Sequence, residues 1–244
     1  MTHIRVINPN TTQAMTEAIG RRARAAVDRS TKVTALSPGM GPESVESHYD
    51  NALAVPGLLA EVAAGEAAGV DGYVIACFGD PGLDAARELA SGPVIGIAEA
   101  AMHTATLVGR GFSVVTTLAR TVGHTWDLAG RYGFERACRG VHACDIPPLG
   151  LDDPSSDALE AVAEACSRAV AGDGCDSVVL GCAGMAEFCP ELTRRVGVPV
   201  IDGVAVAAKL VESLVSLGLG TSKREEYAAP YTKKFSGPLS DFTL

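Results

Sequence analysis

Aromatic residues and positive charge are both scarce in this sequence of 244 residues. Aromatic residues account for 5% of the chain, with a single Trp, whereas hydrophobic residues in total reach 47%. The interior must therefore be built mainly from aliphatic side chains. Acidic residues outnumber basic ones and give a net charge of −9. This balance argues against nucleic acids and anionic membranes as partners, because both require clustered Lys and Arg.

Long hydrophobic runs are also missing. The N-terminus enters a strand-like segment directly, so we expect no secretory signal. The longest apolar segment, residues 204–219, contains Lys209 and Glu212, so we expect no helix that spans a membrane. The seven cysteines are an odd number without regular spacing, which favours reduced thiols in the cytoplasm over a disulfide framework.

Metal-ligand patterns are weak in this sequence. Cys138, His142 and Cys144 have a spacing that superficially suggests metal ligands. A fourth ligand is missing, however, and the segment has the pattern of a strand. We therefore expect no metal site there.

Two segments of the sequence match each other, one in each half of the chain. Residues 70–82 read VDGYVIACFGDPG, and residues 175–187 read CDSVVLGCAGMAE. When the two segments are superposed on their aspartates, Cys77 coincides with Cys182. Each cysteine therefore ends a hydrophobic strand and begins a turn of small residues.

The whole chain follows this duplicated plan, because short apolar runs alternate with Ala-rich helical stretches. We predict strands at 4–8, 32–36, 72–76 and 94–97 in the first half and at 111–116, 139–145, 177–181 and 200–202 in the second. Helices are expected at 12–27, 51–68, 84–90, 122–132, 156–171 and 185–196, and helices 98–108 and 204–217 should cross between the halves.

The predicted fold is α/β, with two pseudo-symmetric Rossmann-like lobes that each contain a mostly parallel sheet flanked by helices. The first lobe comprises residues 1–98 plus 208–244, and the second comprises residues 99–207. The polar tail that follows the last helix should pack on the first lobe or at a subunit contact.

The ends of the strands indicate where a ligand would bind. In open parallel sheets, ligands bind beyond the carboxyl ends of the strands. The turns at 8–11, 77–81, 116–118 and 182–185 all lie at such ends. They are therefore expected to line one cleft between the lobes.

The paired cysteines suggest proton transfer. A lone Cys at a strand end is more often a buried packing residue. Two at equivalent positions, each followed by a Gly-containing turn that opens a helix, favour stabilised thiolates and backbone donors for a developing oxyanion. Thiols facing one substrate from opposite sides would move a proton from one face of a carbon to the other. We therefore predict Cys77 and Cys182 as a two-base catalytic pair.

Other polar residues at these turns have two interpretations. Asp80 can bind substrate N–H groups or cap the following helix, and the cap is favoured. Asn10, Thr116 and Thr117 suit turns and helix caps, but their amide and hydroxyl groups also suit a neutral imide ligand. His103 and His124 lie on predicted helices without a Cys or Ser partner, so both are expected to be packing or surface residues.

The motifs resemble a known family. The segments VINPNT at 6–11, ACFGDPGLDAARE at 76–88 and VLGCAGM at 179–185 are similar to the hydantoin and allantoin racemases of the Asp/Glu racemase superfamily. The resemblance implies cofactor-independent racemisation at C5 of a cyclic ureide, with Cys77 and Cys182 as the acid/base residues. It also implies a homo-oligomer, and tetramers, hexamers and larger forms all agree with it.

Substrate contacts follow from the same resemblance. The turns after the cysteines, with Phe78, Gly79 and Asp80 in one and Ala183 and Gly184 in the other, offer backbone N–H groups and an acidic side chain. Such turns suit an uncharged ring better than a free carboxylate. The 5-substituent should enter a pocket bounded by Phe78 and the loop 37–42, where Met40 suits varied apolar groups.

We therefore expect 5-substituted hydantoins as substrates, with allantoin as the alternative. An allantoin-specific enzyme should present polar partners to the ureido group. Related cysteine-dependent decarboxylases, maleate-type isomerases and non-catalytic two-lobed binding proteins are further alternatives.

Overall fold

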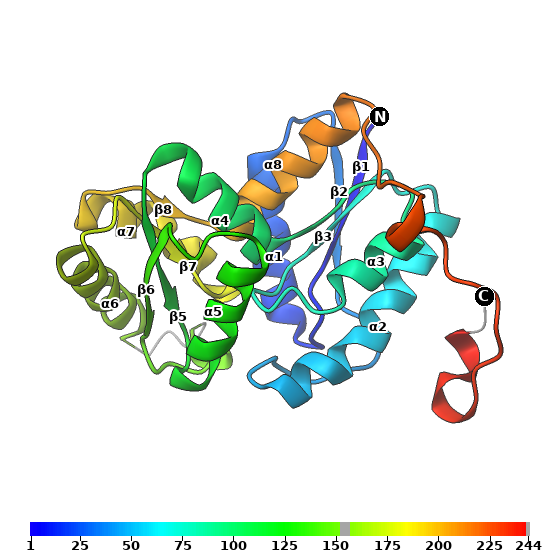
Figure 1. The fold of residues 1–244 in the computed structure, drawn as a ribbon, viewed down its shortest axis with the longest axis horizontal. Coiled ribbons are helices and arrows are strands. Elements are labelled where there is room, and N and C mark those ends of the chain that lie inside the picture. Colours follow the sequence, from blue (N-terminus) through cyan, green and yellow to red (C-terminus); the bar gives the residue numbers. More distant parts are fainter. Residues whose placement is uncertain (152–156, 243–244) are drawn as a thin grey trace.

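Two parallel sheets of four strands form the centre of the protein (Figure 1). The structure is a computed structural model that describes residues 1–151 and 157–242. The first sheet has the order β2-β1-β3-β4, and the second has the order β6-β5-β7-β8. The strands are β1 (His3–Ile7), β2 (Lys32–Leu36), β3 (Gly72–Ile75), β4 (Val94–Gly96), β5 (Phe112–Thr116), β6 (Cys138–Ala143), β7 (Ser177–Leu180) and β8 (Val200–Ile201). This equivalent order in both sheets confirms the predicted duplication.

Helices cover both faces of each sheet. In the first lobe, α1 (Gln13–Ala26) contacts β1 and β2 on one face, and α2 (His48–Ala67) and α3 (Leu83–Leu89) cover the other. In the second lobe, α6 (Ala158–Asp173) and α7 (Cys189–Val196) cover the face opposite to α5 (Val122–Arg131). The predicted α/β architecture is therefore confirmed.

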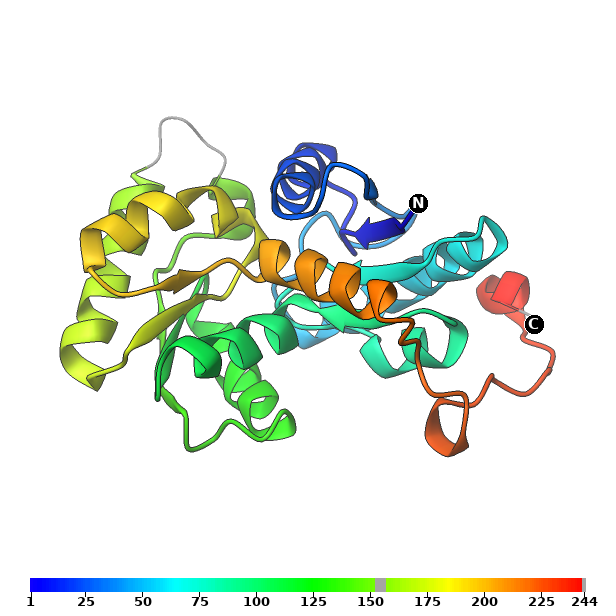
Figure 2. The same cartoon turned by 90° about the horizontal axis from the view of Figure 1, so that it is seen from above.

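Helices α4 (Ile97–Val108) and α8 (Gly203–Ser216) connect the lobes. Helix α4 leaves the first sheet and packs on β7, whereas α8 leaves the second sheet and packs on β3. Seen from above, α8 runs through the middle of the molecule (Figure 2). The two helices begin close together, because a Cβ at Gly203 would lie 2.6 Å from the carbonyl oxygen of Ile97. The lobe boundaries at residues 98 and 207 stay a prediction.

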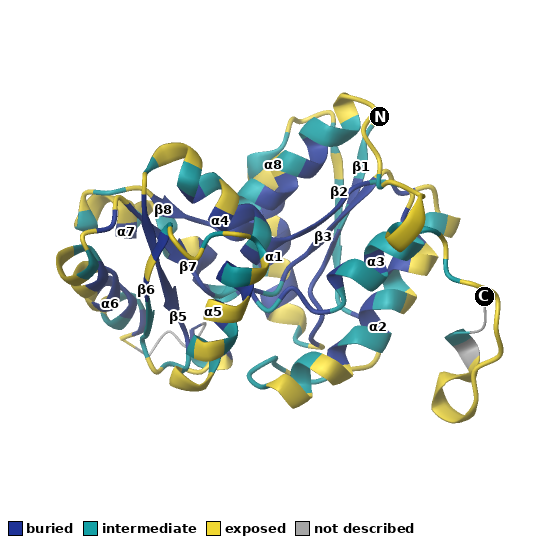
Figure 3. Ribbon diagram, in the orientation of Figure 1, coloured by how far each residue is buried: buried dark blue, intermediate teal, exposed yellow. Residues whose placement is uncertain are grey.

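One buried cluster joins the two lobes. It contains aliphatic side chains from α1, α4 and α8 together with residues of β1, β3, β5 and β7. In Figure 3 the buried residues lie along the sheets and on the inner faces of these helices. Because the apolar core continues from one lobe into the other, it fixes their relative position.

Two predicted helices differ from the observed ones. The helix expected at 51–68 begins earlier, at His48, because Ser47 caps it by accepting a hydrogen bond from the Asp50 amide. The helix expected at 185–196 is divided into a 3₁₀ helix, η3 (Ala183–Phe188), and α7. Pro190 has no N–H group and lies in the first turn of α7, so a new helix begins there. Part of the loop and helix start predicted around 146–156 lies outside the described residues.

The first part of the C-terminal tail contacts the first lobe. Lys223 donates hydrogen bonds to the carbonyl oxygens of Arg87 and Glu88, and the Tyr227 hydroxyl donates to Asp84 at 3.1 Å. Beyond Pro230 the tail extends away from the body and ends in a short 3₁₀ helix, η5 (Gly237–Phe242) (Figure 1). Among the described residues, no helix combines the length and apolarity needed to span a bilayer.

Candidate active site

Cys77 and Cys182 occupy equivalent positions after the third strand of each sheet. The residue before each cysteine extends the strand pairing by one hydrogen bond. The amides of Ala76 and Gly181 both donate across the sheet at 2.8 Å, to the ends of β1 and β5 respectively. The sheets thereby deliver both cysteines to their carboxyl edges in the same orientation.

The same backbone hydrogen bond closes the turn after each cysteine. The Asp80 amide donates to the Cys77 carbonyl at 3.0 Å, and the Met185 amide donates to the Cys182 carbonyl at 3.1 Å. The sequence repeat is therefore also a repeat of backbone hydrogen bonds.

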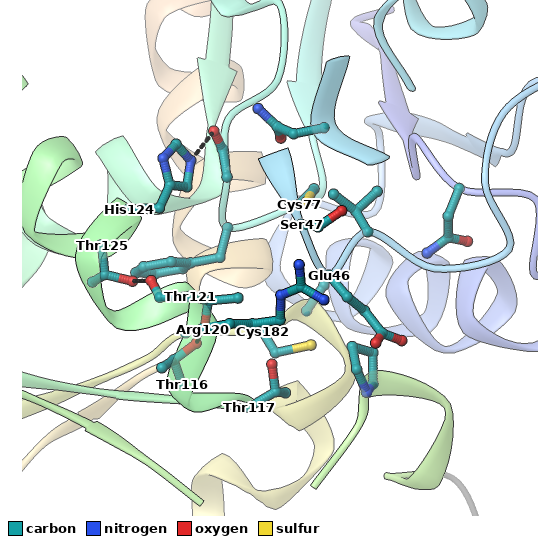
Figure 4. A pocket seen from close by; sticks show the side chains of 18 of the residues that line it. Glu46, Ser47, Cys77, Thr116, Thr117, Arg120, Thr121, His124, Thr125 and Cys182 are labelled. Carbon is teal, nitrogen blue, oxygen red and sulfur yellow. Dashed lines mark hydrogen bonds between the residues drawn. The ribbon is translucent and has the colours of Figure 1, made fainter. Parts of the chain in front are cut away.

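One cavity of about 200 Å³ lies between the lobes and is lined by both cysteines (Figure 4). All four strand-end turns predicted to share a cleft contribute to it. The predicted residues in its wall are Asn10, Cys77, Phe78, Gly79, Thr116, Thr117, Cys182 and Ala183.

Protein atoms surround the Cys77 thiol, although the cavity leaves this side chain partly accessible. Burial raises the pKa of Cys77 to about 12, because a thiolate loses its hydration there. The Gly79 N–H lowers this pKa by donating to the sulfur, whereas the charges of Cys182 and Asp80 raise it. In the free protein, Cys77 is therefore held in its thiol form.

The surroundings of Cys77 correct one expectation. Cys77 does not lie at a helix N-terminus, because α3 begins only at Leu83, after a longer turn. The amide of Gly79 supplies the hydrogen bond that the helix was expected to supply. Cys182, in contrast, directly precedes the 3₁₀ helix η3, which begins at Ala183.

Three asparagines line the cavity, and their side chains are used differently. Asn10 accepts hydrogen bonds from Asn8 and from the Thr12 amide, and its own amide group contacts Met15. Asn8 donates to Asn10 and Thr16, but its Oδ1 has no partner among the described residues. The buried Oδ1 of Asn51 likewise lacks one in that part of the chain. Asn8 and Asn51, more than Asn10, therefore offer free acceptors to a ligand.

The second lobe contributes hydroxyl groups to the cavity wall. Thr116 and Thr117 are buried at the end of β5. The Thr116 hydroxyl is 2.9 Å from that of Thr121, so a local bond already uses it. In Figure 4, Thr117 is drawn next to Cys182.

Met40 lies outside the cavity, contrary to the prediction. The residue is 51% exposed. The loop that carries it packs against α2, where a Cβ at Gly57 would lie 2.5 Å from the Met40 carbonyl oxygen. Residues 45–48 occupy the rim of the cavity in its place.

Asp80 and Gly184 also lie outside the cavity wall. Asp80 caps a helix, which is the kind of role favoured from the sequence. The helix is α4, however, and not α3, which follows Asp80 in the chain. Its carboxylate accepts hydrogen bonds from the amides of Ala98 and Glu99. A side chain at Gly184 would point toward Leu151, which is 3.0 Å from an ideal Cβ.

Several residues of the rim were not predicted. They come from the start of α2 and from the segment that leads into α5, and are Glu46, Ser47, His48, Arg120, Thr121, His124 and Thr125. The signal for the first group was Ser47 followed by Asp50, a pattern typical of a helix start. The Ser47 hydroxyl oxygen accepts a hydrogen bond from the Asp50 amide, and the Asp50 carboxylate accepts from the Glu46 amide and from the Ser47 hydroxyl.

His124 was expected to be a packing or surface residue, and it lines the cavity instead. Its Nε2 lies 3.3 Å from the Gly79 carbonyl oxygen (Figure 4). Its ring meets that of His48 edge to face, with centroids 5.5 Å apart. The sequence of its own helix did not indicate this position, because the residues that His124 contacts, Gly79 and His48, belong to the other lobe.

The Cys138–Cys144 segment has local partners. His142 Nε2 lies 2.6 Å from the Asp173 carboxylate, and the Ser113 hydroxyl donates to the same carboxylate oxygen at 2.6 Å. No group of three or more His, Cys, Asp or Glu side chains is arranged to hold a metal ion in residues 1–151 and 157–242.

Fold and site together define a two-lobed α/β protein that presents a thiol from each lobe to one cavity. The family described as Asp/Glu/Hydantoin racemase matches residues 4–211, and the chain belongs to this family. It is 48% identical to a hydantoin racemase of Rhizobium meliloti over 96% of this chain and 98% of that protein.

Solved structures of two allantoin racemases have the same fold as this chain. The chain matches an allantoin racemase from Klebsiella pneumoniae with a TM-score of 0.97 and 53% identity, covering 100% of this chain and 99% of that one. An allantoin racemase from Pseudomonas fluorescens matches with a TM-score of 0.93 and 38% identity, over 97% of this chain and 100% of that one.

Proposed function

We propose that this protein racemises 5-substituted hydantoins at C5, without a cofactor, by proton transfer between the substrate and the thiols of Cys77 and Cys182. The observation that carries the proposal is that these thiols come from opposite lobes and line one cavity. The similarity to a hydantoin racemase over nearly the whole chain supports the reaction and the substrate class.

The reaction needs one thiolate and one thiol. The thiolate removes the C5 proton from one face, and the electron pair of the broken C–H bond delocalises onto the adjacent carbonyl oxygen. The opposite thiol then gives its proton to the other face of C5. The first cysteine ends as a thiol and the second as a thiolate, while the configuration at C5 is inverted. The other enantiomer uses the cysteines in the reverse roles.

The environment of Cys77 suits both roles. Burial favours its thiol form, so Cys77 acts as the acid for one enantiomer. A thiolate formed from a thiol of high pKa is a strong base, which suits a weakly acidic carbon. Backbone N–H groups of the turns after the cysteines would stabilise the enolate oxygen.

Two free acceptors match the hydantoin ring. The ring carries N–H groups, which need acceptors once water is excluded. Asn8 Oδ1 and Asn51 Oδ1 are buried at the cavity, and neither has a partner among the described residues. We assign the ring N–H groups to these oxygens.

Allantoin is a second candidate substrate, and the polar rim favours it. Its ureido group carries N–H donors and a carbonyl acceptor. Glu46 from the first lobe and Arg120 from the second both line the cavity and offer the complementary groups (Figure 4). The solved structures of allantoin racemases add weight to this candidate.

One experiment tests the reaction and both substrates. Enantiopure 5-benzylhydantoin and allantoin are incubated with the enzyme in heavy water, and optical rotation and deuterium at C5 are followed together. We expect optical activity to decay as deuterium enters C5. Activity on allantoin alone would assign the second substrate, and no decay with either compound would refute the proposal.

We further propose that the protein acts in the cytoplasm as a homo-oligomer. The reduced cysteines support the compartment. The tail supports the assembly, because Tyr231, Phe235 and Leu239 are exposed apolar side chains on a segment that extends from the body. Light scattering during size-exclusion chromatography would test it, and a monomer at micromolar concentration would refute it.

A further inference from the structure

Asp80 is a buried carboxyl group in the turn that carries Cys77. The residue is 2% exposed, and its backbone adopts a left-handed conformation with φ of 43°. Non-glycine residues seldom adopt this conformation, although Asp tolerates it better than most. Contacts of the side chain must therefore hold the turn in this shape.

Three hydrogen bonds reach this carboxylate from two other parts of the fold. The amides of Ala98 and Glu99 at the start of α4 donate at 3.2 and 2.9 Å. The Tyr132 hydroxyl donates at 2.6 Å. The site is built around the carboxylate, because a Cβ at Gly96 would lie 2.2 Å from its carbon.

The Tyr132 bond crosses between the lobes. Tyr132 ends α5, a helix of the second lobe, whereas Asp80 follows β3 of the first. The same helix also reaches the Cys77 turn through His124, whose Nε2 lies 3.3 Å from the Gly79 carbonyl oxygen. Helix α5 thus contacts two consecutive residues of this turn, at Gly79 and Asp80.

Asp80 is close enough to Cys77 to affect it electrostatically. Burial is the main cause that raises the pKa of Cys77, and the charge of Asp80 contributes in the same direction. At the second cysteine, the corresponding residue is the buried apolar Met185. The two turns share one backbone hydrogen bond, but only the first carries an acidic group at this position, and only there is the residue left-handed.

We propose that Asp80 and Tyr132 form a positioning pair by which the second lobe holds the Cys77 thiol against C5 of the substrate. This inference rests on the proposed racemase function. The pair does not touch the cavity, so it acts through the turn. Its loss should slow proton transfer at the Cys77 face and leave the Cys182 face unaffected.

The test removes the Tyr132 hydroxyl in two backgrounds that each keep one working cysteine. Tyr132→Phe is combined with Cys182→Ser and, separately, with Cys77→Ser. Exchange of the C5 hydrogen for deuterium is measured with both enantiomers of 5-benzylhydantoin and of allantoin. We expect Tyr132→Phe to slow exchange by Cys77 about tenfold to a hundredfold, and to change exchange by Cys182 less than about twofold.

Tyr73→Phe is the matched control. Tyr73 is also a buried tyrosine that donates to a carboxylate, that of Glu66 at 2.7 Å, but it lies in the first sheet outside the cavity wall. In the two-cysteine enzyme, Tyr132→Phe should lower kcat with little change in KM, whereas Tyr73→Phe should lower neither. Unfolding of both variants in urea shows whether each is folded.

The outcomes separate the two proposals. If the wild-type enzyme racemises neither compound, the proposed function fails. If it racemises one, and Tyr132→Phe keeps the wild-type kcat or slows exchange equally in both backgrounds, only the positioning role is overturned. Where single-cysteine enzymes exchange too slowly to measure, the comparison of kcat between Tyr132→Phe and Tyr73→Phe decides the question.

Discussion

The charge state of Cys182 affects the ionisation of Cys77 across their shared cavity. Burial is the main cause that raises the pKa of Cys77 to about 12, and the charge of Cys182 contributes in the same direction. Two like charges in one cavity oppose each other, so the state with two thiolates is disfavoured. A two-base racemase needs one thiol opposite one thiolate, because one group accepts a proton while the other donates one.

Substitution of either cysteine tests the two-base mechanism. Cys77→Ser and Cys182→Ser should each lower the rate of racemisation at least about a hundredfold, because a serine hydroxyl is a poor base. Polarimetry measures the rate. Cys175→Ala is the control, since Cys175 is a buried thiol outside the cavity and its loss should leave the rate unchanged. A wild-type rate in either serine variant would exclude the mechanism.

The pH dependence of alkylation tests whether Cys77 is a thiol or a thiolate. Only the thiolate reacts with iodoacetamide, and burial raises the pKa of Cys77 to about 12. In the Cys182→Ser variant, alkylation of Cys77 should therefore accelerate about tenfold per pH unit between about pH 7 and pH 9. Peptide mass spectrometry follows the reaction at this residue. An acceleration of only about threefold between about pH 8 and pH 9 would indicate a thiol of ordinary acidity.

Asp80 should make the stability of the protein depend on pH. Burial raises the pKa of Asp80 from 3.8 to about 7, against the effect of its hydrogen bonds. A carboxyl group with a raised native pKa favours the folded state most when protonated, so its contribution falls as pH rises from about 4 to about 7. We expect the unfolding free energy of the wild type to decrease relative to Asp80→Asn over that interval.

Urea unfolding at several pH values measures this difference. Other titrating groups are common to both proteins and cancel in the comparison. Above about pH 8 the difference should be constant, because Asp80 is then ionised in both the folded and the unfolded state. If the difference in unfolding free energy does not vary with pH, burial does not raise the pKa of Asp80.

The rim residues should distinguish allantoin from an apolar hydantoin. Glu46→Gln and Arg120→Ala remove charged partners for a ureido group but leave both cysteines in place. Each should lower kcat/KM for allantoin about tenfold, the effect of one lost hydrogen bond to a charged group. For 5-benzylhydantoin the change should be below about threefold. Equal losses of kcat/KM with both substrates would show that these residues do not distinguish the two substrates.

The sequence predicted the architecture well because the repeat is local. The α/β class follows from alternating apolar and helical segments, and Cys77 and Cys182 were found as equivalent ends of equivalent strands. The Asn10 prediction placed the right turn in the cavity wall. Its side chain bonds to its neighbours, however, so the free acceptor belongs to Asn8.

The rest of the site depends on contacts between segments that are far apart in the chain. His124 faces the cavity because the second lobe packs against the Gly79 turn, and no local pattern encodes that approach. Asp80 caps α4 because β4 lies next to β3 in the sheet. Met40 was misplaced because the path of its loop depends on packing against Gly57.

The reciprocal crossing of α4 and α8 bears on how such a chain arose. Each helix leaves its own sheet and packs on the other, and the two helices contact each other along the centre of the molecule. A chain of half this length would expose the apolar face of its last helix, whereas two copies related by a two-fold axis would cover both faces. The arrangement has the form of a helix-exchanged homodimer whose two halves are joined in one polypeptide.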